Sequence, residues 1–527
     1  MAEEVSGRKQ GGLIRSTSIV SFFTLLSRVL GMVRDVVVAQ YFGAGGGADA
    51  FFVAFKIPNF FRRLFAEGAF STAFVPVLSE YRTKRQLAEV QLLVSHTAGT
   101  LGGVLILLTI ICGIFAPQVT YLFAPGFSAQ EEKFQLASDM LLLTFPYLML
   151  ISLTGFVGSI LNSYGRFGVP AFTPVWLNVV LILCAVFMAP FMDPPVVALA
   201  WGVLIAGAVQ FVFQLPYLRP LGLLVRPRWG WQDEGVRRIL KLMLPALFGV
   251  SVAQINLLLG TVLASFLEDG SVSWLYYADR LMEMPLGVFG IAIATVILPS
   301  LSRKHASQST EAFSATLDWA VRMNILIGVP AGVAQVILAE PLMVTLFQYG
   351  EFSVKDVVQS ALALQAYSVG VMGFMLVKVL APGYYARLDT STPVKIGIWS
   401  MVANMVVSLA LIVPMTHTGL ALATSVSALF NAGLLYLGLR KAGVYVPGKG
   451  WLRFFLRLCF ATLAMSAVLW WLARDLEEWL AWGWRQRVLW LSLLVVGGMA
   501  AYGAALYLSG VRARHLRSRA GPDEDGL

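Results

Sequence analysis

The sequence predicts an all-α polytopic membrane protein with about 14 transmembrane helices. Hydrophobic residues make up 58% of the 527 residues, whereas ordinary globular chains contain about 45–50%. Charged residues make up only 13%, about half the usual share, and the mean hydropathy is +0.74. The apolar residues recur in blocks of about 20, the length of helix that crosses the hydrocarbon core of a bilayer. A soluble fold could not cover its surface with this composition, so we expect the blocks to lie in lipid.

The expected helices follow one another between clusters of proline, glycine and charged residues, which mark the turns. The predicted spans are residues 17–42, 50–80, 91–116, 134–162, 169–190, 195–217, 238–267, 272–302, 315–339, 355–386, 393–413, 417–440, 452–473 and 486–509. The polar start of the chain runs into the first span without a small-residue cleavage site, so we expect no removable signal peptide.

The loops between these spans differ strongly in lysine and arginine, and this asymmetry predicts the orientation of the chain. Alternate loops carry 25 basic residues on one side and five on the other. The five are Lys133, Lys355, Arg474, Arg485 and Arg487. Because basic loops stay in the cytoplasm, we expect both termini to be cytoplasmic. Orientation also accounts for the net charge of +10 without a nucleic-acid partner.

The two halves of the chain resemble each other at an offset of about 220 to 226 residues. FVPVLSEYRTK around Pro76 recurs as ILPSLSRKHAS around Pro299, and LFAPGFS from Leu122 recurs as LFQYGEFS from Leu346. Six spans in each half make parallel repeats, with a substrate site expected between them. The predicted parts are a cytoplasmic segment (1–16), a first lobe (17–218), a basic linker (219–237), a second lobe (238–440), two C-terminal helices (441–510) and a cytoplasmic tail (511–527).

Nine basic residues fall inside predicted spans. Arg322 and Arg457 lie near the cytoplasmic ends of their spans, and Asp318 is the expected partner of Arg322 on the same helix face. The other seven would lie nearer mid-bilayer, where a cation costs at least about 2.5 to 3.5 kcal/mol. They are Arg28, Arg34, Lys56, Arg62, Arg63, Arg280 and Lys378. Such side chains should face a water-filled cavity or a partner and not lipid. The guanidinium of arginine suits phosphate or carboxylate groups, so the surplus of cations predicts a site for an anionic substrate.

Acidic residues near these cations support a competing interpretation, in which the charges form structural ion pairs. The candidate pairs are Arg34 with Asp35, Arg63 with Glu67, and Arg280 with Asp279 or Glu283. The seven cations outnumber these four acids, which favours an anion-binding site for the cations taken together. For any single cation, a structural ion pair and anion binding both stay open. Asp49 lies at the expected outer rim, as Ser273 does; it could serve in a gate with a second-lobe residue or cap the second helix.

Several segments resemble the signature sequences of the MurJ (MviN) family, the bacterial lipid II flippases of the multidrug/oligosaccharidyl-lipid/polysaccharide exporter superfamily. These segments are SRVLGMVRD, DAFFVAFKIPNFFRRLFAEGAFS, VSWLYYADRLMEMPLGVFG, LFQYGEF and VKVLAPGYYAR. The similarity runs from about residue 13 to residue 510. The chain departs from the family pattern in its polar N-terminal extension, the glycine run from Gly45 to Gly47 and the tail AGPDEDGL.

The resemblance implies two lobes around a central cationic cavity, and two extra helices that form a hydrophobic groove for a polyprenyl tail. The functional cations of the family fall here on Arg28, Arg34, Arg62 and Arg280, and Asp49 and Lys378 also lie at family positions. Lys56 joins the candidate substrate-binding residues because it lies within a span. The candidate gate or ion-pair residues are Asp35, Asp49, Arg63, Glu67, Ser273, Asp279 and Glu283.

The expected function is the transfer of lipid II, an undecaprenyl-diphosphate-linked disaccharide pentapeptide, to the outer leaflet of the bacterial inner membrane for cell-wall synthesis. No bond is made or broken, so we expect a transporter and not an enzyme. We expect a monomer among membrane lipids, with no cofactor and no metal, since the four histidines are scattered. The chain has no nucleotide-binding motif, so the membrane potential or a coupling ion is the candidate drive, and contacts with cell-wall synthesis proteins stay open.

Two other functions compete with lipid II transfer. The first is a secondary exporter of drugs or other amphiphiles on the same scaffold; for organic cations it would need acidic and aromatic cavity walls. The second is a membrane scaffold or lipid-bound enzyme, for which the sequence offers no acid/base or nucleophile arrangement. The sign of the cavity charge separates the first alternative from the flippase.

Overall fold

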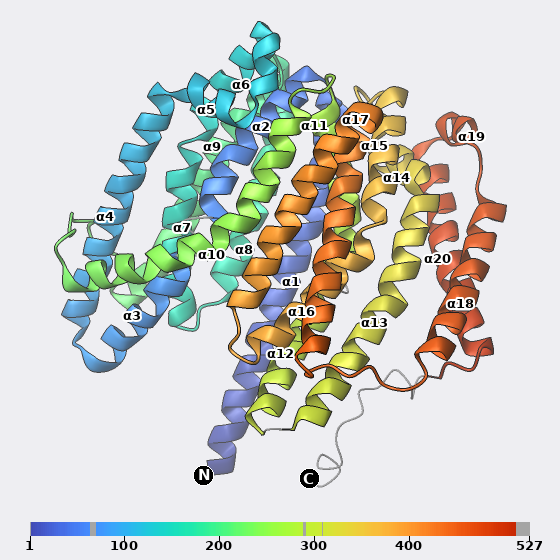
Figure 1. The fold of residues 1–527 in the computed structure, drawn as a ribbon. Coiled ribbons are helices and arrows are strands. Elements are labelled where there is room, and N and C mark those ends of the chain that lie inside the picture. The colour runs from blue at the N-terminus through green and yellow to red at the C-terminus, as the bar shows by residue number, and fades with distance from the viewer. Residues whose placement is uncertain (1, 64–69, 288–290, 308, 513–527) are drawn as a thin grey trace. The chain divides into compact units, whose positions relative to one another are not determined.

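The computed structural model describes residues 2–63, 70–287, 291–307 and 309–512, and these residues form helices and connections with no strand (Figure 1). The predicted all-α fold is confirmed. Within the described residues, nine helical segments are long and apolar enough to cross a membrane. The exact number of spans stays a prediction.

The chain packs as two compact units. The first comprises Met1–Ser273 with Tyr349–Phe352, and the second comprises Trp274–Gln348 with Ser353–Leu527. The packing boundary therefore falls one helix beyond the predicted linker at residues 219–237, because the helix that follows the linker packs with the first unit. The repeat boundary inferred from the sequence stays a prediction.

The first unit contains ten α-helices among the described residues. They are α1 (Ala2–Phe42), α2 (Gly46–Arg62), α3 (Ser71–Lys84), α4 (Leu87–Ile114), α5 (Ala116–Phe123), α6 (Glu131–Thr144), α7 (Tyr147–Ser163), α8 (Gly168–Leu183), α9 (Val197–Gln214) and α10 (Glu234–Ala264). Short helices η2 (Pro125–Ala129) and η5 (Leu215–Leu221) follow α5 and α9. A core that includes Phe74, Leu78 and Ile160 joins α3, α4 and α7, so these helices support the rest of the unit.

The chain enters the second unit within α11 (Ser271–Pro285), whose first three residues belong to the first unit. Its other helices are α12 (Ile291–Ala306), α13 (Thr310–Ile337), α14 (Ala339–Phe347), α15 (Val354–Ser368), α16 (Val371–Tyr385), α17 (Ser391–Lys441), α18 (Trp451–Leu472), α19 (Leu476–Ala481) and α20 (Trp484–Leu508). A core that includes Leu317, Leu380 and Leu435 joins α13, α16 and α17.

Helix α17 is continuous by hydrogen bonding but carries a backbone break at Thr416, where φ is 49° and ψ is −132°. The break falls between the predicted spans 393–413 and 417–440, so α17 contains both. In the first turn of α17, the backbone N–H of Thr392 donates to the side chain of Asp389, which precedes the helix. This bond holds the pKa of the Asp389 carboxyl below its usual value. The carboxylate thus satisfies an N–H that the first turn of a helix leaves without an intrahelical partner.

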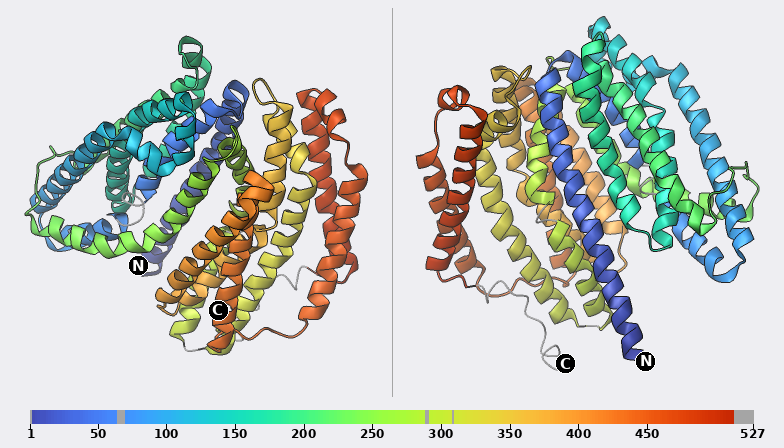
Figure 2. Two further views of the ribbon diagram at one scale, coloured as in Figure 1. Left: turned by 45° about the horizontal axis from the view of Figure 1, so that its top comes forward. Right: turned by 180° about the vertical axis from the view of Figure 1, so that it is seen from behind.

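Helices α18 and α20 form an antiparallel pair, and both views of Figure 2 show them side by side. The sequence predicted this pair as an addition outside the repeat, and the structure ties it to α13 and α14 of the second unit. At one end, buried Asp318 of α13 accepts hydrogen bonds from Arg322 Nε (2.8 Å), Tyr445 OH (2.7 Å) and Trp451 Nε1 (3.0 Å). The predicted Arg322–Asp318 pair is therefore confirmed, and it also fixes the start of α18.

Candidate functional site

Arg34 of α1 lies buried against α8, with its predicted ion pair formed. Its Nη2 and Nε donate to Asp35 Oδ1 at 2.6 and 3.0 Å, and its Nη1 donates to Asn178 Oδ1 at 3.1 Å. The amide of Asn178 in turn donates to the carbonyl oxygen of Ser27 at 3.0 Å. These bonds orient the guanidinium and tie α1 to α8. The sequence predicted Asp35 as a partner and gave no reason to pair Asn178 with Arg34.

Arg28 lies six residues, about 1.7 helical turns, before Arg34 and has a different environment. Its side chain is exposed and forms no hydrogen bond or ion pair with the part of the chain that the structure describes. Lys378 of α16 and Arg63 at the end of α2 are exposed as well. Glu67, the predicted partner of Arg63, lies outside the described residues. An exposed cation on an apolar helix can be reached directly by an anionic ligand.

Arg280 of α11 is half-buried and lies beside an aromatic ring and an acid of its own helix. Its Nη2 donates to Tyr276 OH at 3.2 Å, and its guanidinium lies 5.0 Å from the centre of the Tyr276 ring. Its Nη1 is 3.7 Å from Glu283 Oε2, so one of the two predicted pairings is present as a long contact between partly exposed side chains. Such a pair contributes little stability, typically about 0 to 1 kcal/mol.

Arg62 and Lys56 are both half-buried on α2. The Nε of Arg62 donates to Asn59 Oδ1 at 3.1 Å, which orients its guanidinium along the helix. Of the seven span cations, five belong to the first unit, and Arg280 and Lys378 belong to the second.

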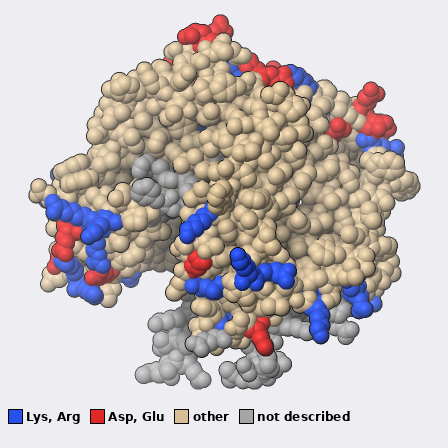
Figure 3. Space-filling model, in the orientation of Figure 1, with Lys and Arg blue, Asp and Glu red and all other residues tan. Residues whose placement is uncertain are grey.

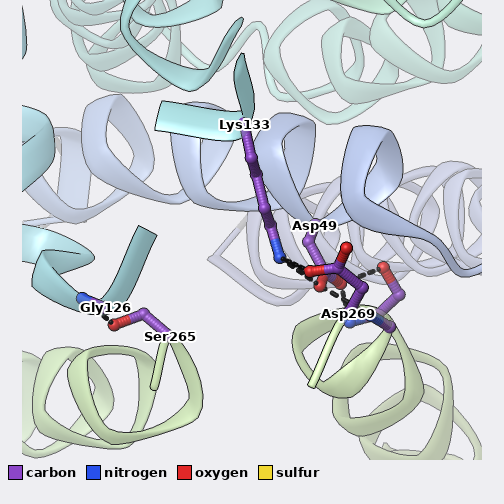
Figure 4. Close-up of polar contacts among 7 residues, drawn as sticks. Asp49, Gly126, Lys133, Ser265 and Asp269 are labelled. Carbon is purple, nitrogen blue, oxygen red and sulfur yellow. Dashed lines mark hydrogen bonds and ion pairs between the residues drawn. The ribbon is translucent and has the colours of Figure 1, made fainter. Parts of the chain in front are cut away.

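Asp49 is the centre of a buried polar cluster in the first unit, shown in Figure 4. Its carboxylate accepts hydrogen bonds from Lys133 Nζ (3.1 Å), Gly270 N (2.8 Å) and both the N (2.9 Å) and Oγ (2.6 Å) of Ser273. Lys133 also donates to Asp269 at 2.8 Å. Asp49 is 1% exposed and Lys133 is 8% exposed, so this is an ion pair removed from water.

The carboxylate of Asp49 sits at the N-terminus of α11, which begins at Ser271. The first N–H groups of a helix have no intrahelical acceptor and carry a partial positive charge, so a carboxylate there is stabilising. The sequence suggested two roles for Asp49, a contact with a residue of the predicted second lobe and a cap on helix α2. The contact is present, through Gly270 and Ser273. The helix that Asp49 caps is α11, and not its own helix α2. Whether this contact opens as a gate stays a prediction.

Two glycine-containing connections dock at the ends of long helices within the same unit. The N–H of Gly126 donates to Ser265 Oγ at 3.0 Å, and a Cβ at Gly126 would lie 2.3 Å from the Ser265 carbonyl oxygen (Figure 4). A Cβ at Gly350, where φ is 58°, would lie 2.2 Å from the carbonyl oxygen of Gln40. These are the LFAPGFS and LFQYGEFS segments of the predicted repeat, and each docks at the end of the first helix of the opposite half.

Two buried cations were missed from the sequence, Lys133 and Arg487, both of which were assigned to outer loops. Arg487 of α20 is 5% exposed and donates to the carbonyl oxygens of Trp479 (3.0 Å), Leu480 (3.1 Å), Val344 (3.3 Å) and Gln348 (3.1 Å). It thereby joins the C-terminal ends of α14 and α19 to α20. No local pattern distinguishes Arg487 from the exposed Arg485 two residues earlier.

Comparison with known proteins gives one consistent family. The family model described as "Lipid II flippase MurJ" matches residues 38–483. The chain is 50% identical over 513 residues to the "Probable lipid II flippase MurJ" of Vibrio cholerae, covering 96% of this chain and 98% of the relative. It is 49% identical over 509 residues to the protein of the same name from Haemophilus influenzae, covering 94% of this chain and 100% of the relative.

Solved structures agree with this relationship. The structure titled "Lipid II flippase MurJ, inward closed conformation" matches with a TM-score of 0.78 at 25% identity, over 93% of this chain and 98% of that one. A structure titled as an inward-facing multidrug resistance MATE family transporter of the MOP superfamily matches with a TM-score of 0.63 at 15% identity, over 81% of this chain and 98% of that one, which shows a shared fold. The chain is a multi-pass membrane protein and belongs to the MurJ family of lipid II flippases, which are transporters and not enzymes.

Proposed function

We propose that this protein transfers lipid II from the cytoplasmic to the outer leaflet of the inner membrane by alternating access. The observation that carries the proposal is identity of about one half, over nearly the whole chain, to proteins named as probable lipid II flippases. The diphosphate of lipid II is anionic, and the cations on α1, α2, α11 and α16 supply the complementary charge.

The cations divide into two kinds by their surroundings, and we assign them different roles. Exposed Arg28 and Lys378 and half-buried Arg62 and Arg280 are each candidates for direct contact with the anionic head group. Arg34 is held by Asp35 and Asn178, so it would present a guanidinium of fixed orientation. A fixed donor loses less entropy when it binds an anion than a flexible one does.

The hydrocarbon tail would stay in lipid, along the pair α18 and α20. Large apolar side chains are exposed on both helices, including Leu463 (69%), Trp470 (80%) and Leu489 (68%). The electrical potential favours transfer of the head group, since each negative charge moved outward gains about 2.3 kcal/mol per 100 mV. The proposal therefore needs no nucleotide.

The test of this function is transfer of lipid II by the purified full-length chain. In vesicles of defined phospholipids, the protein should make lipid II in the inner leaflet accessible to a membrane-impermeant enzyme added outside. Vesicles without protein, and vesicles that contain the Arg28→Ala variant, are the controls. If a cationic amphiphile is moved and lipid II is not, the chain is an amphiphile exporter and the proposal fails.

Substitution of the candidate binding cations should abolish most of the activity. We expect Arg28→Ala, Arg34→Ala, Arg62→Ala and Arg280→Ala each to lower transfer by about 10- to 100-fold, because a hydrogen bond to a charged group contributes about 1.5 to 3 kcal/mol. Lysine should restore only part of it, since its point charge lacks the bidentate geometry of arginine. Growth of a depletion strain at matched protein levels measures the effect, and Arg303→Ala is the control because Arg303 is exposed outside the candidate set. Normal growth of all four alanine variants would contradict the anion site.

We propose that both termini are cytoplasmic. Within the first unit, Figure 3 shows lysine and arginine side chains around the connections that flank α3 and α10, and acidic side chains at the end where α6 begins. Cysteines at Arg228 or Arg303 should be protected from an impermeant thiol reagent in intact cells, whereas cysteines at Asp193 or Glu351 should react. All four positions are exposed, so labelling reports the side of the membrane and not burial. The opposite labelling pattern would invert the topology.

A further inference from the structure

A pocket of about 370 Å³ opens in the first unit, beside α1, α8, α9 and η5. Its lining includes Phe23, Phe172, Phe213 and Tyr217, with Gly168 at the start of α8 and Arg166 in the connection that precedes it. We call it the α1–α8 pocket. Its volume is within the range of about 300 to 1,000 Å³ that is typical of small-molecule sites, and none of the span cations or the residues of the Asp49 cluster lines it.

One wall of the α1–α8 pocket is a continuous row of aromatic rings. The ring centres of Phe23 and Phe172 are 5.2 Å apart, those of Phe172 and Phe213 are 5.6 Å apart, and those of Phe213 and Tyr217 are 5.8 Å apart. The pairs are tilted or edge-to-face, which are the favourable arrangements of aromatic rings. The rings brace one another across four elements, α1, α8, α9 and η5, so the wall is preformed and suits an apolar chain.

Arg166 supplies the charge of the pocket. It follows the end of α7, where Gly165 has a φ of 75° and the N–H of Arg166 donates to the Leu161 carbonyl oxygen at 2.9 Å, so its backbone is fixed. Its side chain is half-buried and forms no hydrogen bond or ion pair with the residues that the structure describes. Acidic side chains are absent from the lining. A half-buried guanidinium next to an apolar wall favours an anionic partner.

We propose that the α1–α8 pocket binds an anionic glycerophospholipid, with the lipid phosphate on Arg166 and an acyl segment against Phe23, Phe172 and Phe213. We expect an amphipathic ligand because the pocket itself combines a cation with a wall of aromatic rings. Arg166 belongs to the basic set of loops, and the cytoplasmic leaflet, where such loops lie, carries anionic lipids. The proposal does not depend on lipid II as the transported substrate.

Occupancy of this site has a consequence for α1. Phe23 precedes Arg28 and Arg34 on the same helix, so a lipid wedged against Phe23 and α8 would stabilise the arrangement that the Arg34–Asn178 bond also holds. The lipid would act as a positioning ligand and would not be transported.

Native mass spectrometry of the full-length protein with dioleoyl phosphatidylglycerol or dioleoyl phosphatidylcholine tests the proposal. We expect one phosphatidylglycerol to bind at least about tenfold more tightly than phosphatidylcholine, a difference of about 1.4 kcal/mol. Arg166→Met should abolish this preference, and Arg166→Lys should keep part of it. Arg219→Met is the matched control, because Arg219 is an exposed arginine on η5 outside the pocket lining, and it should bind as the native chain does.

Two competition arms identify the source of the phosphate. Inorganic phosphate should not displace the bound phosphatidylglycerol, because it lacks the acyl chain; displacement at millimolar concentration would overturn the lipid assignment. Lipid II that displaces the phospholipid from the native chain but not from Arg166→Met would assign the pocket to the substrate and also overturn it. If Arg166→Met fails to fold, Phe172→Leu is the second variant, and unchanged phosphatidylglycerol affinity in that variant would contradict the acyl contact.

Discussion

Replacing Asp49 with alanine should remove most of the folded protein from the membrane. The substitution deletes the acceptor for Lys133, Gly270 and Ser273 at once. Breaking one side of a buried ion pair costs about 3 to 5 kcal/mol, and the buried ammonium of Lys133 would keep only its contact with the partly exposed Asp269. That loss is a large part of the stability of about 5 to 15 kcal/mol that most native proteins have. Abundance by immunoblot and the melting temperature of the purified protein measure it.

Three further variants separate the causes of this loss. Asp49→Asn keeps the shape and an acceptor oxygen but removes the charge, so we expect an intermediate loss. The double variant Asp49→Ala with Lys133→Met removes both charges and should recover part of the abundance, which shows coupling between the two sites. Asp269→Asn should have little effect, since the Asp269 side chain is 46% exposed. Equal losses for Asp49→Ala and Asp269→Asn would contradict the central role of Asp49.

Replacing Arg487 with methionine should release from α14 the end of the α18–α20 pair where α20 begins. Methionine fills much of the space but donates no hydrogen bond, which leaves four carbonyl oxygens without this donor. Each buried acceptor left unsatisfied costs about 1 to 3 kcal/mol. Hydrogen exchange should rise in α20 near Trp484 and in α19, while exchange in the first unit stays unchanged.

The control for this variant is Arg485→Met, because Arg485 is exposed on the same turn and packs only on the Trp484 ring among the contacts described. Arg487→Lys should give an intermediate result, since one ammonium cannot reach carbonyls on both sides of the guanidinium. The Tyr502 OH bond to Leu326 O (2.6 Å) and the Asp318 cluster should hold the rest of the pair in place. Unchanged exchange in Arg487→Met would show that these contacts suffice without Arg487.

The contacts of the charged residues were predictable from the sequence only where the two partners lie close together along the chain. Arg34 with Asp35, Arg280 with Glu283 and Arg322 with Asp318 are separated by one, three and four residues, and helical geometry alone brings such pairs into reach. The bonds from Arg34 to Asn178 and from Asp49 to Ser273 cross 144 and 224 residues. No periodicity carries that information.

The internal repeat had a local signature but an unexpected structural role. Gly126 and Gly350 were part of matching segments in the two halves, which suggested homology and nothing about contacts. The structure places each glycine against the end of a long helix in the opposite half, at distances where a side chain would not fit. A close approach of two backbones explains why these matched positions carry glycine.

The amino-acid order was enough to determine the membrane class, the helical architecture and the break in α17. Lipid offers no hydrogen-bond partners, so every backbone N–H and C=O group must be hydrogen-bonded within a helix, and this requirement produces long apolar runs in the sequence. It could not determine the surroundings of the individual charges. Lys133 follows two glutamates and Arg487 lies three residues after Trp484, both near span ends, where exposed loop cations also occur. Both are buried because distant segments bring a carboxylate or helix-terminal carbonyl oxygens to them. Burial of a charge depends on partners supplied in three dimensions, so only the tertiary structure could decide which cations are anchors and which are exposed to a ligand.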